Sequence, residues 1–197
     1  MKKIEFIWRE VLASSLEERK NRFSQKALAQ KFRLSTSTVF QALKKPRLSG
    51  AIKVGSRGFE LVDFEKLLFI WATERKLNSE ISYQTYCDLP ILEIEGLMPA
   101  EVIPTAYTAY RFLFQETPAD YDQVYFYAEN DITVKERFPL SKKEPNIFIL
   151  KADPYLSQYQ PAPPLAQVFV DLWNLPSWYA KEYQNALLVK IKERLNL

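Results

Sequence analysis

The sequence predicts a mixed α/β protein of the α+β type, made of two parts that differ in pattern and in charge. Apolar residues recur at helical spacing before residue 46, whereas β-prone runs mix with helical segments after residue 81. Residues 1–62 carry 14 basic and 5 acidic side chains, a net charge of +9, and the other 135 residues carry 13 and 19, a net charge of −6. We therefore expect one domain at residues 1–62, a connecting helix at 63–80 and a second α/β domain at 81–197.

The first domain begins with three predicted helices. Apolar residues at helical spacing indicate a helix over about residues 4–19. Ser24 is suited to cap a second helix that ends near Phe32. Ser35 is suited to cap a third helix that runs to about Lys45, where Pro46 is expected to stop it.

The tight turn between the second and third helices and the segment after Pro46 complete this domain. Many such turns contain Gly, but this one contains Arg33, which indicates a variant or strained turn. After Pro46, two β-prone runs at residues 51–54 and 59–62 flank Gly55-Ser56-Arg57-Gly58 and predict a hairpin. Three helices followed by a hairpin predict a winged helix-turn-helix, with Arg57 at the tip of the wing.

The charge of this domain indicates its partner. From Arg19 to Phe59 there are eleven Lys or Arg residues and no Asp or Glu. Such a run is often only a solvated surface, but its position on a helix-turn-helix pattern favours double-stranded DNA. We expect seven cations to contact phosphates. They are Lys26, Lys31, Arg33, Lys45, Arg47, Lys53 and Arg57.

The third helix is expected to enter the major groove with its N-terminal half leading. Five residues are candidates for this face: Ser35, Thr36, Ser37, Gln41 and Lys44. Ser37, Gln41 and Lys44 share one side of the helix, and Gln41 can pair with an adenine. Phe40 either contacts a thymine methyl group or packs half-buried. Two copies on paired half-sites are the expected arrangement on DNA.

The remainder of the chain predicts a connecting helix and a small α/β domain. Asp63 is suited to cap the helix, which ends near Leu77. Strands are expected at residues 81–86, 124–127 and 147–150, and helices at residues 104–114, 165–172 and 178–195. All eleven tyrosines lie beyond residue 81. They are expected to pack in the core and at its rim, or to form a partner-binding surface.

A segment near the C-terminus, in which Gln and Asp stand among apolar residues, is similar to a sequence signature of a known family. The segment Leu165-Ala-Gln-Val-Phe-Val-Asp-Leu172 precedes a helix that contains Glu182. With Gln167 and Asp171 at these places, the chain resembles the AbiEi-like antitoxins, which are transcriptional regulators of type IV toxin–antitoxin systems. The resemblance spans nearly the whole chain.

The chain also departs from that family. A Gly that often precedes the small-residue helix is missing at Pro104-Thr105, and the segment after Leu172 is bulkier, with Trp173 and Trp178. The resemblance implies autoregulation, in which the winged helix represses its own operon by binding its operator. It also implies that the C-terminal domain supports neutralisation of a nucleotidyltransferase toxin.

Composition restricts other functions. Hydrophobic residues make up 47% of the 197, and no apolar run approaches the roughly 18–20 residues that cross a bilayer. The N-terminus lacks the apolar core of a signal peptide. A single cysteine, Cys87, excludes an intrachain disulfide, and the absence of histidine removes the commonest general base and metal ligand. We expect a cytoplasmic protein that is not an enzyme and uses no metal, cofactor or membrane.

Two alternatives to the antitoxin hypothesis stay open. The first is a winged-helix repressor whose C-terminal domain senses a small ligand. The second is a Mg²⁺-dependent nuclease or nucleotidyltransferase fused to the DNA-binding domain, for which a set of acidic and basic residues would form the site. That set is Glu93, Glu95, Asp120, Asp122, Lys142, Lys143 and Lys151. Solvated carboxylates explain the same pattern, and Gln167 and Asp171 can equally be structural residues that bond a neighbouring element.

Overall fold

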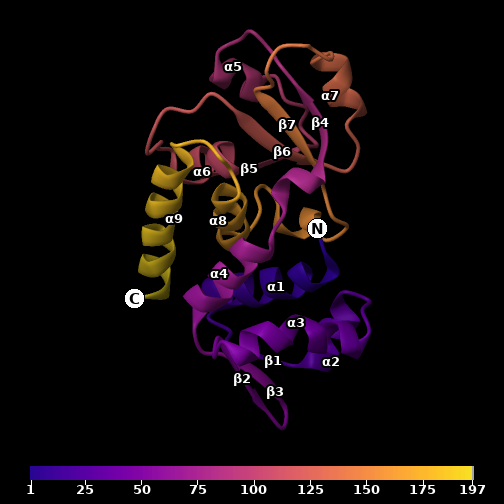
Figure 1. The fold of residues 1–197 in the computed structure, drawn as a ribbon, viewed down its shortest axis with the longest axis vertical. Coiled ribbons are helices and arrows are strands. Elements are labelled where there is room, and N and C mark those ends of the chain that lie inside the picture. Colours follow the sequence, from indigo (N-terminus) through magenta and orange to yellow (C-terminus); the bar gives the residue numbers. More distant parts are fainter. Residues whose placement is uncertain (197) are drawn as a thin grey trace. The chain divides into compact units, whose positions relative to one another are not determined.

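The computed structural model describes residues 1–196 and has a mixed α/β fold of the α+β type, as the sequence predicts (Figure 1). Nine α-helices and two sheets form within the described residues. The chain divides into two compact units. The first contains Met1–Arg75, Pro164–Val170 and residues 190–196, and the second contains Lys76–Pro163 and Asp171–Val189. The domain limits expected from the sequence stay predictions.

The first unit contains a cluster of helices and a small antiparallel sheet. Its elements are α1 (Lys3–Glu18), β1 (Arg22–Phe23), α2 (Gln25–Lys31), α3 (Thr36–Leu48), β2 (Ile52–Gly55), β3 (Gly58–Leu61) and α4 (Phe64–Glu74). The strand order is β1-β3-β2. The hairpin of β2 and β3 and the three helices before it are confirmed. β1 is only two residues long and is not predicted by the sequence, because its pairing with β3 is a non-local contact.

Three helices of this unit begin where the capping residues predict. Ser24, Ser35 and Asp63 each accept a hydrogen bond on the side-chain oxygen from the backbone N–H three residues later, at 3.4, 3.1 and 2.9 Å. These bonds satisfy amides that have no partner inside the helix. Helices α2 and α3 pack against each other, and Leu28 of α2 and Val39 of α3 are buried.

The expectation that Pro46 ends the third helix is wrong. Helix α3 continues through Pro46 to Leu48. A proline has no N–H for the carbonyl four residues earlier, which here belongs to Ala42. The indole Nε1 of Trp8 in α1 donates to that carbonyl at 2.8 Å in the buried interior. The tertiary contact therefore replaces the missing helical bond.

Helices α2 and α3 end in the same hydrogen-bond pattern with different residues. At the end of α2, Leu34 N–H bonds Ala29 C=O at 2.9 Å and Arg33 N–H bonds Gln30 C=O at 3.2 Å. This is a Schellman motif, and Arg33 occupies its left-handed position with φ of 49°. Gly50 occupies the equivalent position after α3 with φ of 77°. The unusual turn expected at Arg33 is confirmed.

Buried polar side chains connect the helices of the first unit. The Glu5 carboxylate of α1 accepts hydrogen bonds from the Trp71 indole at 2.9 Å and the Arg75 guanidinium at 3.3 Å. Arg9 donates to the side chain of Gln167 at 3.1 Å, and both residues are fully buried. Gln167 therefore acts as a structural residue, one of the two roles expected for it.

The second unit is built on a four-stranded mixed sheet. Its own elements are the 3₁₀ helix η1 (Leu77–Glu80), β4 (Ile81–Thr85), α5 (Ile91–Gly96), β5 (Ile103–Thr105), α6 (Ala106–Phe114), β6 (Val124–Ala128), α7 (Ile132–Arg137), β7 (Ile147–Lys151) and the 3₁₀ helix η2 (Leu156–Tyr159). Helices α8 (Leu165–Trp173) and α9 (Ala180–Leu195) contribute residues to both units. The strand order is β4-β7-β6-β5.

Strands β6 and β7 lie parallel at the centre of this sheet and are connected through α7, while the outer pairs are antiparallel. Every residue of β6 is buried, which is typical of a central strand covered on both faces. Val124 and Phe126 belong to the apolar core on one face, and Tyr125 and Tyr127 alternate with them.

Sequence reasoning placed residues 104–114 in one helix, and this is wrong at its start. Pro104 and Thr105 belong to β5, where they pair with Phe126 and Tyr125. Helix α6 begins only at Ala106, which has φ of 51°. The pairing with β6 overrides the helical pattern of the sequence.

The tyrosines all belong to the second unit, and none of them is exposed. Tyr107 contacts the rings of Tyr179 and Tyr183, each with a centroid separation of 5.0 Å. The buried Asp171 carboxylate accepts hydrogen bonds from Tyr127 at 2.6 Å and Thr105 at 2.8 Å. The tyrosines therefore pack in the core and at its rim, and Asp171 bonds neighbouring elements.

Candidate nucleic-acid interface

The outward side of α3 carries the residues expected to face a ligand. Ser37, Gln41 and Lys44 are all exposed, while Val39 and Leu43 on the opposite side are buried. At about 100° per residue these two sets lie on opposite faces of the helix. The amphipathic arrangement predicted from the sequence is confirmed.

The start of α3 presents three short hydroxyl side chains. Ser35, Thr36 and Ser37 are exposed. The Ser35 hydroxyl, besides capping the helix, lies 2.8 Å from the Ser37 hydroxyl and 2.9 Å from that of Thr38. The first backbone amides of a helix are directed outward and carry partial positive charge. This end of α3 therefore offers hydrogen-bond donors with little steric bulk around them.

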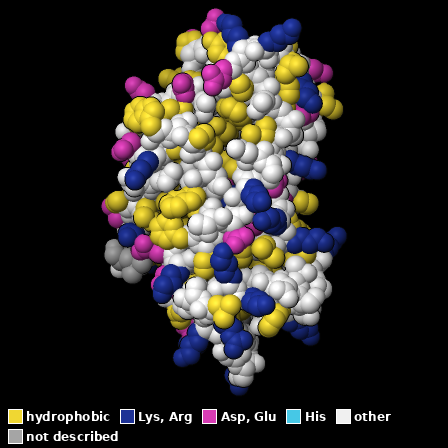
Figure 2. Space-filling model, viewed as in Figure 1, with side chains coloured by type: hydrophobic (Ala, Val, Ile, Leu, Met, Phe, Trp, Pro, Cys, Tyr) yellow, Lys and Arg dark blue, Asp and Glu magenta, His cyan; other side chains and the backbone are white. Residues whose placement is uncertain are grey.

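The cations of the candidate set lie on α2, the Arg33 turn, α3 and the hairpin. All seven expected phosphate ligands are exposed. Figure 2 shows Lys and Arg side chains gathered over the part of the surface that the first unit occupies in Figure 1. No Asp or Glu occurs between residues 19 and 59, so this segment supplies no acid of its own to them.

Two of these cations are neutralised by acids from other parts of the first unit. Lys31 Nζ lies 2.6 Å from the Glu10 carboxylate of α1, and Lys45 Nζ lies 2.5 Å from the Glu74 carboxylate of α4. Sequence reasoning missed both pairs because the acids are 21 and 29 residues away along the chain. The charges of Lys31 and Lys45 are therefore less available to a phosphate than the sequence predicts.

Among the described residues, the other five expected phosphate ligands have no ion pair, and neither has Lys44 on the outward face of α3. The five are Lys26, Arg33, Arg47, Lys53 and Arg57. An exposed cation outside an ion pair keeps more of its charge available to an incoming anion than a paired one does, although Lys53 is opposite Glu60 in the β2–β3 pairing. These five and Lys44 carry most of the attraction that this surface can exert on a polyanion.

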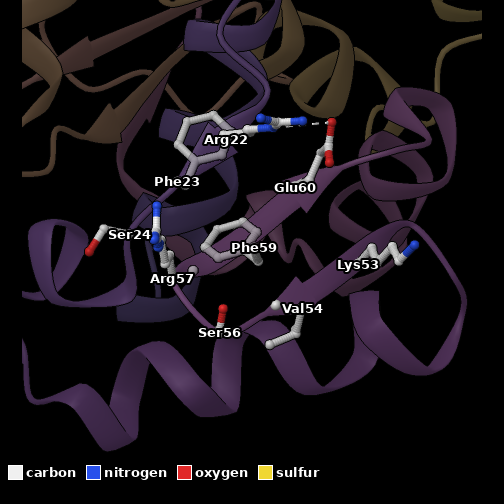
Figure 3. Close-up of a pocket in the computed structure, with 11 residues that line it drawn as sticks. Arg22, Phe23, Ser24, Lys53, Val54, Ser56, Arg57, Phe59 and Glu60 are labelled. Atoms are coloured by element: carbon white, nitrogen blue, oxygen red, sulfur yellow. Dashed lines mark ion pairs between the residues drawn. The ribbon is translucent and has the colours of Figure 1, made fainter.

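A hollow of about 510 Å³ lies between β1 and the hairpin (Figure 3). The rings of Phe23 and Phe59 stack in it with centroids 5.5 Å apart, and Arg22 pairs with Glu60 at 3.6 Å. Arg57 and Lys53 point in different directions from the hairpin. The hairpin is thus held on β1 by an apolar stack, and its exposed cations extend from a fixed base.

Gly58 makes the close approach of β3 and β1 feasible. It has φ of 148°, and a Cβ atom at this position would lie 2.1 Å from the carbonyl oxygen of Phe23. No side chain larger than hydrogen fits there without moving the backbone. Gly55, at the other side of the turn, has open space around its Cα.

Two of the four acidic residues considered for a metal site, Glu95 and Asp122, have other bonds. The Glu95 carboxylate accepts from the Tyr121 hydroxyl at 2.7 Å and pairs with Arg111. Asp122 accepts from the Tyr179 hydroxyl. Within residues 1–196, no group of three or more His, Cys, Asp or Glu side chains could hold a metal ion. Within the same residues, no helix has the length and hydropathy needed to span a bilayer.

Comparison with known proteins gives no match to this chain. No family model, no curated protein and no solved structure matches it. The resemblance to AbiEi-like antitoxins therefore stays a prediction.

Proposed function

We propose that the first unit is a winged helix-turn-helix that binds double-stranded DNA, and that the protein is a sequence-specific transcriptional regulator. The order of elements supports this. Helices α2 and α3 are joined by a tight turn, and the β2–β3 hairpin follows α3 and pairs with β1. In this arrangement α3 is the recognition helix and the hairpin is the wing.

The observation that carries the proposal is the set of exposed cations on α2, the Arg33 turn, α3 and the hairpin that have no ion pair, together with the polar outward face of α3. A surface of one charge sign attracts a polyanion over a long range and gives affinity for the phosphate backbone. Ser37, Gln41 and Lys44 then lie where base edges of the major groove would be. Phosphate contacts provide affinity, and the outward face of α3 provides sequence specificity.

The experiment compares two variants on duplexes that tile the DNA upstream of the protein's own gene. Gln41→Ala should relax sequence preference, because it removes the base-reading amide. Arg57→Ala should weaken binding to all duplexes alike, because it removes a phosphate contact. Lys181→Ala, which removes an exposed cation from the second unit, is the matched control.

Binding is measured by fluorescence anisotropy against the upstream duplexes and a scrambled duplex. The proposal requires tighter binding to at least one upstream duplex than to the scrambled one. Equal binding by wild type, Gln41→Ala and Arg57→Ala would place the recognition face elsewhere. No binding to any duplex would reject the function.

The antitoxin role rests on the resemblance alone and stays a prediction. Of the residues that carry the resemblance, Gln167, Asp171 and Leu172 are fully buried and could not contact a toxin directly, whereas Glu182 is exposed. A nucleotidyltransferase toxin would have to be recognised by Glu182 or by residues outside this set. Repression of its own operon without any toxin neutralisation would retain the DNA-binding proposal and remove the antitoxin one.

A further inference from the structure

Two exposed apolar residues on the outward face of α3, Phe40 and Leu48, are not explained by phosphate binding, and only Phe40 lies in the half of the helix that is expected to lead into the groove. Phe40 is 53% exposed, so the half-buried core role considered for it is not the one it has. Its ring is an apolar group within a segment whose charged residues are all cations. A phosphate gains nothing from an apolar contact, and exposing a ring to water is unfavourable.

The Phe40 ring lies on the same side of α3 as the polar residues that are expected to contact base edges. At about 100° per residue, Ser37, Phe40, Gln41 and Lys44 fall within an arc of about 100°, opposite the buried Val39. A single apolar residue at a surface is common and needs no function. Phe40 differs because it directly precedes an exposed amide in the second turn of the proposed recognition helix.

The major groove contains one apolar group that such a ring can cover, the 5-methyl group of thymine. The partner base of thymine is adenine, whose N6 and N7 atoms suit the amide of Gln41. An adjacent ring and amide are therefore complementary to the two halves of an A·T pair. Guanine and cytosine offer no methyl group, and guanine is read best by Arg or Lys.

We infer that Phe40 and Gln41 together read A·T in the major groove. Phe40 covers a thymine methyl group, and Gln41 bonds an adenine of the same base pair or a neighbouring one. This inference rests on the proposed DNA-binding function and adds the chemistry of the site that is recognised.

The test replaces single thymines by deoxyuridine in the bound upstream duplex, which removes one methyl group and changes no hydrogen bond. At one thymine, wild-type binding should weaken about fourfold, the effect of uncovering one methyl-sized apolar group. Phe40→Ala should bind the thymine and uracil duplexes equally. Phe40→Leu, which keeps an apolar side chain, should retain a preference for thymine.

A second base replacement in the duplex identifies the adenine that Gln41 contacts. Replacing single adenines by 7-deazaadenine removes the N7 acceptor, and wild type should lose affinity at an adenine no more than one base pair from the sensitive thymine. Gln41→Ala should bind the duplex with adenine and the duplex with 7-deazaadenine equally. Thermal melts followed by circular dichroism check that all variants are folded, which the exposure of both side chains favours.

The outcomes separate the inference from the proposed function. Duplex binding in which no thymine responds to loss of its methyl group overturns the inference and leaves DNA binding intact. A thymine effect that persists in Phe40→Ala assigns the contact to another residue and also overturns it. Absence of binding to every duplex rejects both.

Discussion

The two units differ in where they place their polar side chains. In the first unit, the cations between residues 19 and 59 are at the surface, and five of the seven candidate phosphate ligands have no ion pair within the described chain. In the second unit, the tyrosines are buried or half-buried, and several of their hydroxyl groups bond carboxylates. Exposed and unbalanced charge is available to a ligand, whereas hydroxyl groups that are already bonded stabilise the unit itself. The difference supports the proposal that DNA binding belongs to the first unit.

The largest expected effect concerns the base of the hairpin. Gly58→Ala would place a Cβ atom 2.1 Å from the Phe23 carbonyl oxygen and should lower the free energy of unfolding by about 2–4 kcal/mol. DNA affinity should fall with it, because the hairpin loses its position. The measurement is urea denaturation together with anisotropy.

Gly55→Ala is the matched control for Gly58→Ala, since no atom lies within 4 Å of the added methyl group. It should change the free energy of unfolding by less than about 0.5 kcal/mol. Equal effects of the two substitutions would mean that the contact between β1 and β3 is not as described.

The next prediction concerns alkaline pH and the second unit. Burial and a hydrogen bond to Glu116 raise the pKa of Tyr110 to about 12, and burial and a hydrogen bond to Asp122 raise the pKa of Tyr179 to about 12. An unfolded tyrosine ionises near pH 10. Between these pH values the folded state keeps both hydroxyl protons, whereas the unfolded state loses them. The resulting contribution to the free energy of unfolding is complete below pH 10 and is lost as the pH rises towards 12.

The measurement is a series of thermal melts between pH 8 and pH 12. The double variant Tyr110→Phe and Tyr179→Phe should show a smaller fall in melting temperature across this range, because phenylalanine cannot ionise. The first unit contains no tyrosine, so Phe40→Leu, a change at an exposed position of that unit, serves as a control that should leave the pH dependence unchanged. An identical fall in wild type and double variant would contradict the assignment.

A smaller effect is expected at the turn between α2 and α3. Arg33 has φ of 49°, a conformation that costs a non-glycine residue about 1 kcal/mol. Arg33→Gly should raise the free energy of unfolding by about that amount and weaken DNA binding, because one exposed cation is lost. Gly50 has the same left-handed conformation at the end of α3, and glycine is the residue that best stabilises this conformation.

Arg33→Lys provides the contrast for Arg33→Gly. It keeps the charge and the strained backbone, so it should leave stability and DNA affinity close to those of wild type. A loss of stability in Arg33→Gly would mean that the arginine side chain supports the fold rather than a ligand.

The smallest effect should come from releasing a neutralised cation. Glu10→Gln removes the carboxylate that lies 2.6 Å from Lys31 Nζ, and DNA affinity should rise about two- to fivefold as Lys31 becomes available. Glu136→Gln removes an exposed acid of the second unit and is the control. A rise of equal size in both would indicate a general effect of net charge.

Much of the first unit was predictable because its signals are local. Ser24, Ser35 and Asp63 cap the helices that the sequence assigned to them. The failures have non-local causes. Pro46 stays inside α3 because the Trp8 indole bonds the carbonyl of Ala42, which is 34 residues later along the chain than Trp8. The pairs of Lys31 with Glu10 and Lys45 with Glu74 depend in the same way on packing that no local pattern encodes.

The second unit was less predictable for the same reason. Its buried strands β6 and β7 were identified from apolar runs, but the short helices α5 and α7 were not. The assignment of Pro104 and Thr105 to a strand depends on pairing with β6, whose residues lie about twenty positions later. A six-residue helix between strands has too few turns to give a periodic signal.

The most direct test of the central claim is the salt dependence of binding to the upstream duplex. If about five of the exposed cations contact phosphates, the logarithm of the association constant should fall with the logarithm of salt concentration with a slope of about −4 to −5. Arg57→Ala should reduce the magnitude of that slope by about one, and Lys181→Ala should leave it unchanged. Binding that is nearly independent of salt would contradict the account.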